Sequence, residues 1–180
     1  MKNQNTKKLA YAALFLALCL VLPMLTGQIP QIGSMLLPMH IPVLLCGLVC
    51  GWQYGAAVGF VAPLLRSVLF GMPPMYPVAI AMAFELLTYG LVIGLVYRRM
   101  AQKGAAGVYA ALLTAMVAGR LVWGVAEVVL LGLGGKAFTA QAFLAGVLLN
   151  AVPGIIVQLV LIPAVMAALQ KAGAVKEYAE

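Results

Sequence analysis

The sequence predicts an all-α integral membrane protein, a bundle of six transmembrane helices with both termini in the cytoplasm. Of its 180 residues, 65% are hydrophobic and 8% are charged, whereas soluble domains are about half apolar and a quarter charged. The basic residues gather in segments that alternate along the chain with long apolar stretches. No stretch has the polarity or length of a separate soluble module, so we expect one transmembrane domain over residues 1–180.

The first span is predicted at about 8–26. Its basic start and apolar body resemble a signal peptide, but no small-x-small cleavage site follows, because "PMLTGQIP" comes next. We therefore expect a helix that is retained in the mature protein.

The stretch from His40 to Phe70 is predicted to form two short helices, at about 38–51 and 54–71. One continuous helix would extend about 46 Å at ~1.5 Å per residue, well beyond a hydrocarbon core of ~30 Å. The sequence "GWQYG" at its middle supplies two glycines and interfacial aromatic residues suited to a turn. We expect this turn at Trp52–Tyr54.

The last three spans are predicted from apolar stretches at about 77–98, 105–132 and 142–170. With six spans and an inner N-terminus, Lys136 alone among the flanking basic residues falls outside. The basic residues on the inner side are Lys2, Lys7, Lys8, Arg98, Arg99, Lys103, Lys171 and Lys176. This distribution satisfies the positive-inside rule, whereas a five-span chain would carry its C-terminal lysines outside. The net charge of +7 therefore reports topology rather than a nucleic-acid partner.

Strongly polar residues lie within the predicted spans, where such groups are costly and usually face a bundle interior or a cavity. They are Arg66, Glu85, Arg120, Glu127, Asn150 and Gln158. Helical rise, counted from the outer ends, puts Glu85 and Asn150 about 12 Å deep, and Arg66 and Glu127 about 7 Å. Four predicted helices thus carry a polar group in their outer half, so we predict that Glu85 lines a pocket open to the outside. The alternative is a structural ion pair that joins one of these glutamates to one of the arginines.

Helical spacing places several of these residues on shared faces. Arg120, Trp123 and Glu127 follow one another at i, i+3 and i+7. Glu85 lies one turn before Tyr89. Such faces combine aromatic surface with charge, as small-molecule sites do. The residues predicted to bind a substrate are Arg66, Tyr76, Glu85, Tyr89, Arg120, Trp123, Glu127 and Asn150.

Two features near the ends of the spans carry further expectations. Met72 and Met75, with Tyr76, form either an adaptable gate over the pocket or anchors at the membrane interface. His40 lies between two prolines, and we expect it to cap a helix rather than to bind a ligand.

Several kinds of chemistry are missing from the sequence. No His, Glu and Cys cluster has metal-ligand spacing, no glycine-rich phosphate loop is present, and no serine or cysteine has a base within reach on one helix face. Cys19, Cys46 and Cys50 are expected to be small apolar filler. We therefore expect neither an enzyme nor a cofactor or metal site, and any ATP-driven work must come from a partner.

Three segments together resemble a known family. They are Ala13-x-x-x-Ala17 in the first helix, the block "LPMHIPVLLCGLVCGWQYGAAVGFVAPLLRSVLFGMPPMYP", and "AMAFELLTYGLVIGLVY". On these residues the chain resembles the substrate-binding S components of energy-coupling factor (ECF) vitamin transporters. A short span at His40, a glycine-containing inward turn and a proline-rich outer loop before a Glu-bearing helix are similar to the pantothenate-type branch.

The resemblance implies a six-helix protein of the bacterial cell membrane that binds a vitamin-like ligand near its outer face. It also implies association with a transmembrane coupling protein and two ATPase subunits. In that family the Ala-x-x-x-Ala motif packs against the coupling protein, which transfers here to Ala13 and Ala17. Small residues four apart also allow helices to approach closely in lipid. The alternative is that both alanines pack only inside the bundle.

The ligand stays open between three candidates that the resemblance implies. Pantothenate is favoured, because Arg66 or Arg120 could hold its carboxylate through two parallel hydrogen bonds. Glu85 and Glu127 suit hydroxyl, amide or amine donors and would equally favour a queuosine precursor, and a cobalamin is the third candidate. A different class of function is a self-sufficient secondary transporter or channel that uses one of the glutamates as a proton site. Against it, the sequence lacks the clear inverted repeat of many carriers.

Overall fold

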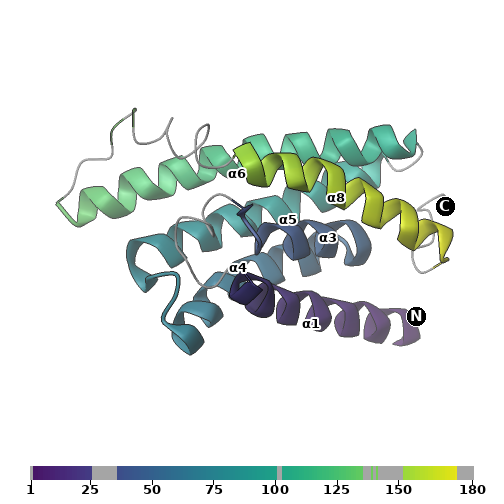
Figure 1. The fold of residues 1–180 in the computed structure, drawn as a ribbon, viewed down its shortest axis with the longest axis horizontal. Coiled ribbons are helices and arrows are strands. Elements are labelled where there is room, and N and C mark those ends of the chain that lie inside the picture. The colour runs from purple at the N-terminus through teal and green to yellow at the C-terminus, as the bar shows by residue number, and fades with distance from the viewer. Residues whose placement is uncertain are drawn as a thin grey trace.

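The computed structural model describes residues 2–25, 36–100, 103–135, 139, 141 and 152–173. Across these ranges the chain is helical and contains no strand, which confirms the all-α class. The elements keep the labels of Figure 1. They are α1 (Lys2–Leu25), α3 (His40–Cys50), α4 (Trp52–Phe70), the π-helical turn η1 (Met75–Ala79), α5 (Ile80–Met100), α6 (Ala105–Leu133) and α8 (Val152–Lys171).

Five of the six α-helices in the described ranges are long and apolar enough to cross a membrane. These candidate spans are Gln4–Leu25, Trp52–Phe70, Met75–Met100, Ala105–Leu133 and Val152–Lys171. The remaining helix, α3, is apolar but has only 11 residues, which extend about 16 Å against a hydrocarbon core of ~30 Å. The bundle of six spans and the cytoplasmic position of both termini therefore stay predictions.

The turn between α3 and α4 differs from the expected one. The sequence predicted it at Trp52–Tyr54, but Trp52 is already the first residue of α4 and the break falls on Gly51 alone. The φ angle of Gly51 is 97°, a conformation that a residue without a Cβ atom adopts at little cost. One glycine is therefore enough to reverse the chain, and the aromatic residues after it belong to the helix.

Helices α4 and α5 approach each other so closely that glycine is required at the contact. A methyl group on Gly59 would overlap the backbone carbonyl of Leu86, and one on Gly90 would overlap the backbone of Gly55. Such small residues let helix backbones touch in lipid, where hydrophobicity does not drive association. The result is a tight wall of α4 and α5 from which Glu85, on α5, projects into the buried interior.

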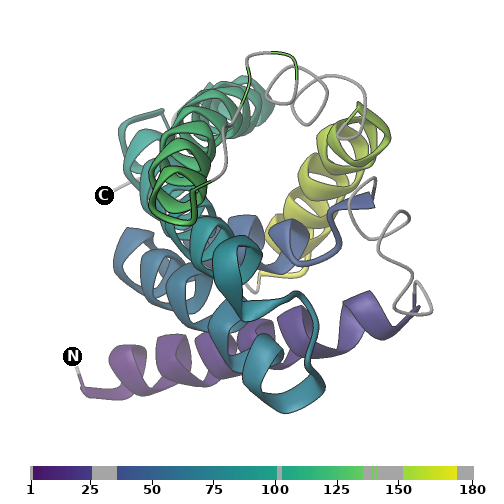
Figure 2. The same cartoon turned by 90° about the vertical axis from the view of Figure 1, so that its left-hand side faces the viewer.

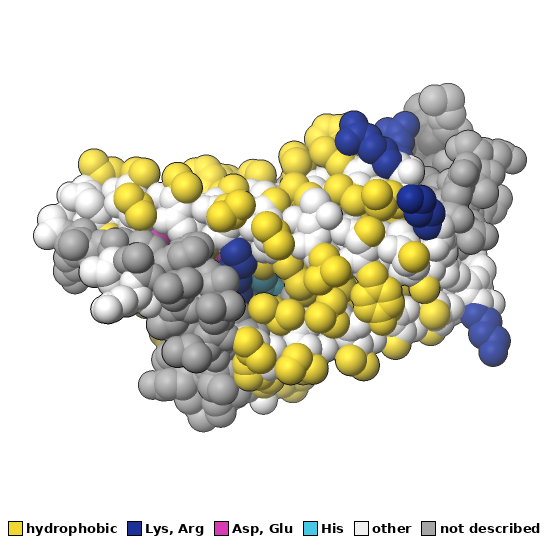
Figure 3. Space-filling view, turned by 90° about the horizontal axis from the view of Figure 1, so that it is seen from above, with side chains coloured by type: hydrophobic (Ala, Val, Ile, Leu, Met, Phe, Trp, Pro, Cys, Tyr) yellow, Lys and Arg dark blue, Asp and Glu magenta, His cyan; other side chains and the backbone are white. Residues whose placement is uncertain are grey.

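The helices are arranged so that the start of α1, the end of α5, the start of α6 and the end of α8 share one end of the molecule (Figure 1). Seen along the long axis in Figure 2, α6 and α8 lie on one side and α1 on the opposite side, with α3, α4 and α5 between them. Basic side chains gather at one end of the face in Figure 3, and a further small group of charged side chains lies near its middle. Helices α3 and α8 both begin part-way along α6 (Figure 1).

Candidate functional site

Three helices converge on one buried carboxylate. Glu85, on α5, is 1% exposed, and its Oε1 lies 2.9 Å from Nη1 of Arg120 on α6. The same oxygen lies 3.4 Å from Nε2 of His40, the first residue of α3. An ion pair between Glu85 and Arg120 is therefore present, in line with the structural alternative drawn from the sequence.

Tyr89 fixes the surroundings of this carboxylate. It lies one turn after Glu85, is 1% exposed, and its ring meets the imidazole of His40 edge-on, with centroids 5.1 Å apart. A methyl group added to Gly119 would lie 2.6 Å from a carbon of the Tyr89 ring, so α6 packs directly on this ring beside Arg120. We call His40, Glu85, Tyr89 and Arg120 the Glu85 cluster.

Several buried polar atoms have no hydrogen-bond partner within the described ranges. They are His40 Nδ1 and Nε2, Glu85 Oε1, Arg120 Nε and Nη2, and Gln158 Nε2. The Glu85 oxygen is among them because its ion pair with Arg120 lacks hydrogen-bond geometry. Buried polar groups in native proteins are nearly always paired, and each unpaired one costs about 1–3 kcal/mol. The Glu85 cluster therefore has hydrogen-bonding capacity to offer to a ligand.

On α6, the first two residues of the predicted shared face, Arg120 and Trp123, contact each other. The guanidinium carbon of Arg120 lies 5.8 Å from the ring centroid of Trp123, a distance at which the ring attracts a cation. Glu127 follows one turn later and is buried, with 7% exposure. Arg120 is thus held by an aromatic ring on its own helix and by Glu85 on α5.

Arg66 has a different environment. It is 3% exposed, and its Nη1 donates a hydrogen bond to the backbone carbonyl of Leu20 on α1. Its guanidinium carbon lies 5.3 Å from the ring centroid of Phe70 on its own helix. These contacts tie α4 to α1, and no ion pair joins Arg66 to a carboxylate among the residues that the structure describes.

The remaining residues predicted to bind a substrate lie apart or are not described. Tyr76 is half exposed, and its hydroxyl donates to the backbone carbonyl of Leu130 near the end of α6. This hydrogen bond links η1, which precedes α5, to α6. Asn150 lies outside the described residues, as does Lys136 of the topology argument.

The expected capping role of His40 is wrong. The residue at the N-cap of α3 is Met39, which makes no side-chain capping hydrogen bond, and His40 turns into the bundle toward Glu85. The sequence contained a signal for this inward position. A lone polar residue at the start of a short apolar helix is costly to bury unless it has a polar partner inside the bundle. Gln158, a polar residue at membrane depth that was left out of the predicted site, is also buried, with 1% exposure.

Helix α1 turns its two faces to different surroundings. Ala12, Phe15 and Cys19 face the core, whereas Ala13 and Ala17 are exposed. The alternative that both alanines pack only inside the bundle therefore does not hold.

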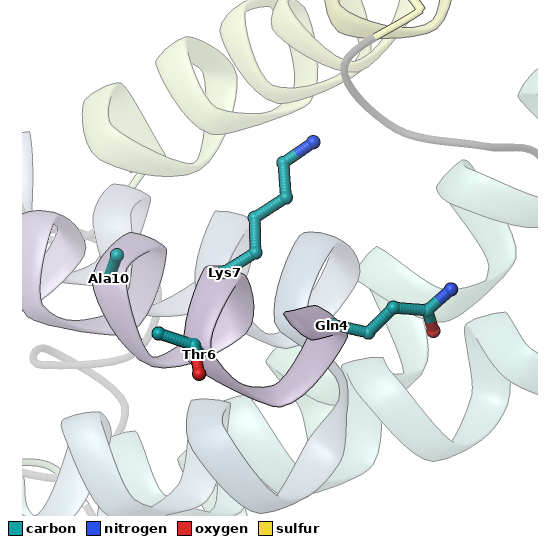
Figure 4. A pocket seen from close by; sticks show the side chains of 4 residues that line it. All are labelled: Gln4, Thr6, Lys7 and Ala10. Atoms are coloured by element: carbon teal, nitrogen blue, oxygen red, sulfur yellow. The ribbon is translucent and has the colours of Figure 1, made fainter. Parts of the chain in front are cut away.

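A shallow recess lies on the first turns of the same helix, lined by Gln4, Thr6, Lys7 and Ala10. Figure 4 shows these side chains pointing in different directions from one helix. They do not converge on a common point, so the recess lacks the geometry of a binding site. Among the described residues there is also no group of three or more His, Cys, Asp or Glu side chains that could hold a metal ion.

Comparison with known protein families gives a match that covers most of the chain. The family of ECF transporter substrate-specific components matches residues 7–166. The chain belongs to this family. No curated protein sequence and no solved structure matches it.

Membership fixes the broad role of this S component. S components are transporter subunits rather than enzymes, and the family implies partnership with ECF coupling and ATPase subunits. Together with the five long apolar helices, it makes the chain a multi-pass membrane protein. The matched residues include every member of the Glu85 cluster and the alanine pair on α1.

Proposed function

We propose that this S component captures a small polar micronutrient at the Glu85 cluster and passes it to an ATP-driven ECF module. The observation that carries the proposal is the set of buried polar atoms without partners around Glu85 and Arg120. Polar groups at membrane depth are costly and mark substrate pathways more often than packing. A ligand that supplied the missing hydrogen bonds would offset that cost only while bound.

The proposed site consists of Glu85, Tyr89 and Arg120, with Trp123 and Glu127 continuing along the same face of α6. Arg66 and Tyr76 are not included, because each donates its hydrogen bond to a backbone carbonyl, of α1 and α6 respectively. Within the vitamin class, pantothenate is the favoured ligand of the proposed site, and a queuosine precursor or a cobalamin is the alternative.

We further propose six spans in a single domain of a bacterial cell membrane, with both termini in the cytoplasm. The support is the uneven placement of basic residues along the sequence. A cysteine introduced beside Lys136 should be labelled by an impermeant thiol reagent from outside, and one beside Lys103 should not. Labelling of the second site alone would reverse the orientation.

For coupling, we propose that Ala13 and Ala17 contact the transmembrane coupling protein. Both are exposed on α1, and a surface of small side chains lets a second helix approach its backbone.

The decisive experiment measures thermal stability of the detergent-purified protein against a vitamin panel, with native mass spectrometry to identify any bound species. A ligand that binds only the folded protein stabilises it by an amount that grows with its concentration over its Kd. Uptake of that ligand should then require ATP and a co-expressed ECF module. Absence of saturable binding across the panel refutes the proposal, and uptake by the protein alone would favour the secondary transporter.

A further inference from the structure

The guanidinium group of Arg120 is engaged on one side and unengaged on the other. Its Nη1 faces Glu85 at 2.9 Å, while Nε and Nη2 are buried without a hydrogen-bond partner in the described part of the chain. These two nitrogens carry parallel N–H bonds along one edge of the planar group. That edge matches the two oxygens of a carboxylate, which it binds through two parallel, charge-assisted hydrogen bonds.

The balance of donors and acceptors in the cluster also favours a ligand rich in acceptors. Arg120 Nε and Nη2 can only donate. The one carboxylate acceptor among the unpartnered atoms, Glu85 Oε1, already lies beside Arg120 and His40. A ligand that brought mainly donors would therefore leave the two arginine nitrogens without partners.

His40 adds a further hydrogen-bond donor to the cluster. Its Nε2 lies 3.4 Å from the Glu85 oxygen that Arg120 faces, and its Nδ1 is buried without a hydrogen-bond partner in the described ranges. A histidine ring carries at least one N–H, so His40 can donate to a carboxylate oxygen.

We propose that the ligand of this S component presents a carboxylate to the Nε and Nη2 edge of Arg120, while Glu85 stays on Nη1. The inference rests on the proposed function and assigns the substrate class of the same site. Arg66, the other arginine inside the bundle, is excluded from this role because it donates to the Leu20 carbonyl and lies against Phe70.

The test uses matched pairs of compounds on the full-length protein in detergent. Each carboxylic acid of the vitamin panel is paired with its primary amide, and pantothenate also with pantothenol, in which a hydroxymethyl group replaces the carboxylate. The acid that binds should do so at least about tenfold more tightly than its neutral partner, because charge-assisted hydrogen bonds are lost. The readout is the Kd from concentration-dependent thermal stabilisation.

Two lysine variants locate the carboxylate. Arg120→Lys keeps the charge opposite Glu85 but loses the fork of donors, so the affinity for the acid should fall at least about tenfold and the preference over the amide should shrink. Arg66→Lys should leave both unchanged. The melting temperature without ligand is measured for each variant to show that it is folded.

The outcomes separate this inference from the proposed function. Saturable binding with equal affinity for acid and amide overturns the carboxylate assignment but leaves the S component a binding protein. Acid binding that Arg120→Lys does not weaken, or that Arg66→Lys weakens equally, overturns the role of Arg120. A protein that binds no compound of either set overturns the proposed function and this inference with it.

Discussion

Arg66 and Arg120 are both arginines held inside an apolar bundle, yet their surroundings differ. Arg66 donates to a backbone carbonyl of α1 and lies against a ring of its own helix. Arg120 has a carboxylate partner on α5 and two buried nitrogens without any partner in the described ranges. The first arginine joins two helices. The second keeps nitrogens that can still donate hydrogen bonds. These unused donors, rather than burial itself, distinguish a candidate binding site from a structural contact.

The difference follows from what each arginine meets. Pro23 lies within α1 and has no N–H to donate to the carbonyl of Cys19, four residues earlier. Arg66 donates to the adjacent carbonyl, that of Leu20, so it adds a hydrogen bond to a turn that lacks one. Arg120 meets side chains instead of backbone, and the rings of Tyr89 and Trp123 shape the space around it.

The largest expected effect concerns the ion pair. Glu85→Gln and Arg120→Met should each lower the free energy of unfolding by about 3–5 kcal/mol, because each leaves a buried charge without its partner. The double variant should cost less than the sum of the two, since it removes both charges. Chemical unfolding in detergent measures this cycle. Strictly additive losses would show that the two side chains do not depend on each other.

A smaller effect is expected at the other arginine. Arg66→Met should lower the free energy of unfolding by about 1.5–3 kcal/mol, the contribution of a hydrogen bond from a charged group. No carboxylate is stranded by the change, because Arg66 has no ion-pair partner among the described residues. A loss as large as that of Arg120→Met would erase the distinction between the two arginines.

The packing of α6 on Tyr89 offers a test with a control on the same helix. Gly119→Ala should push against the Tyr89 ring, lower the free energy of unfolding by about 1–3 kcal/mol and weaken ligand binding by displacing the neighbouring Arg120. Gly132→Ala adds a methyl group where no atom lies within 4 Å, so it should be neutral or slightly stabilising. Thermal melts of both variants, with and without ligand, measure the contrast. Equal effects would mean that Tyr89 is not pressed against α6.

The smallest expected effect on stability lies on the outer face of α1, the helix that Arg66 holds. Ala13→Trp and Ala17→Trp should change the free energy of unfolding by no more than about 0.5 kcal/mol, because both positions are exposed. Ligand binding should persist while ATP-dependent uptake with the ECF module is lost. Leu14→Trp, on a neighbouring exposed position, is the control and should retain uptake. Uptake that survives at all three positions would remove this face from the proposed interface.

Much of the fold could be predicted because it depends on local properties of the chain. The predicted span at 105–132 corresponds to α6 (Ala105–Leu133), and that at 54–71 to α4 (Trp52–Phe70). Helical spacing likewise anticipated that Arg120 and Trp123 share a face, and they are in contact. The turn at Gly51 was misplaced by a few residues, because aromatic residues suit both an interfacial turn and the first turn of a helix.

The candidate site was only partly predictable. Glu85 and Arg120 were identified as polar groups at depth, but the sequence left four pairings of glutamate and arginine open. The sequence favours a capping role for His40 and gives no reason to include Gln158 in the site. Spacing along one helix states which residues share a face, but it does not state which faces meet.

By itself the sequence determined a membrane protein built of helices, because apolar length against the thickness of a bilayer is a property of each segment alone. It also supplied small residues where helices touch. Only the tertiary structure decided that Arg120, and not Arg66, joins Glu85 and keeps an open edge. The physical reason is that hydrogen-bond partners come from other helices, so whether a buried polar atom is satisfied depends on how distant segments pack against one another.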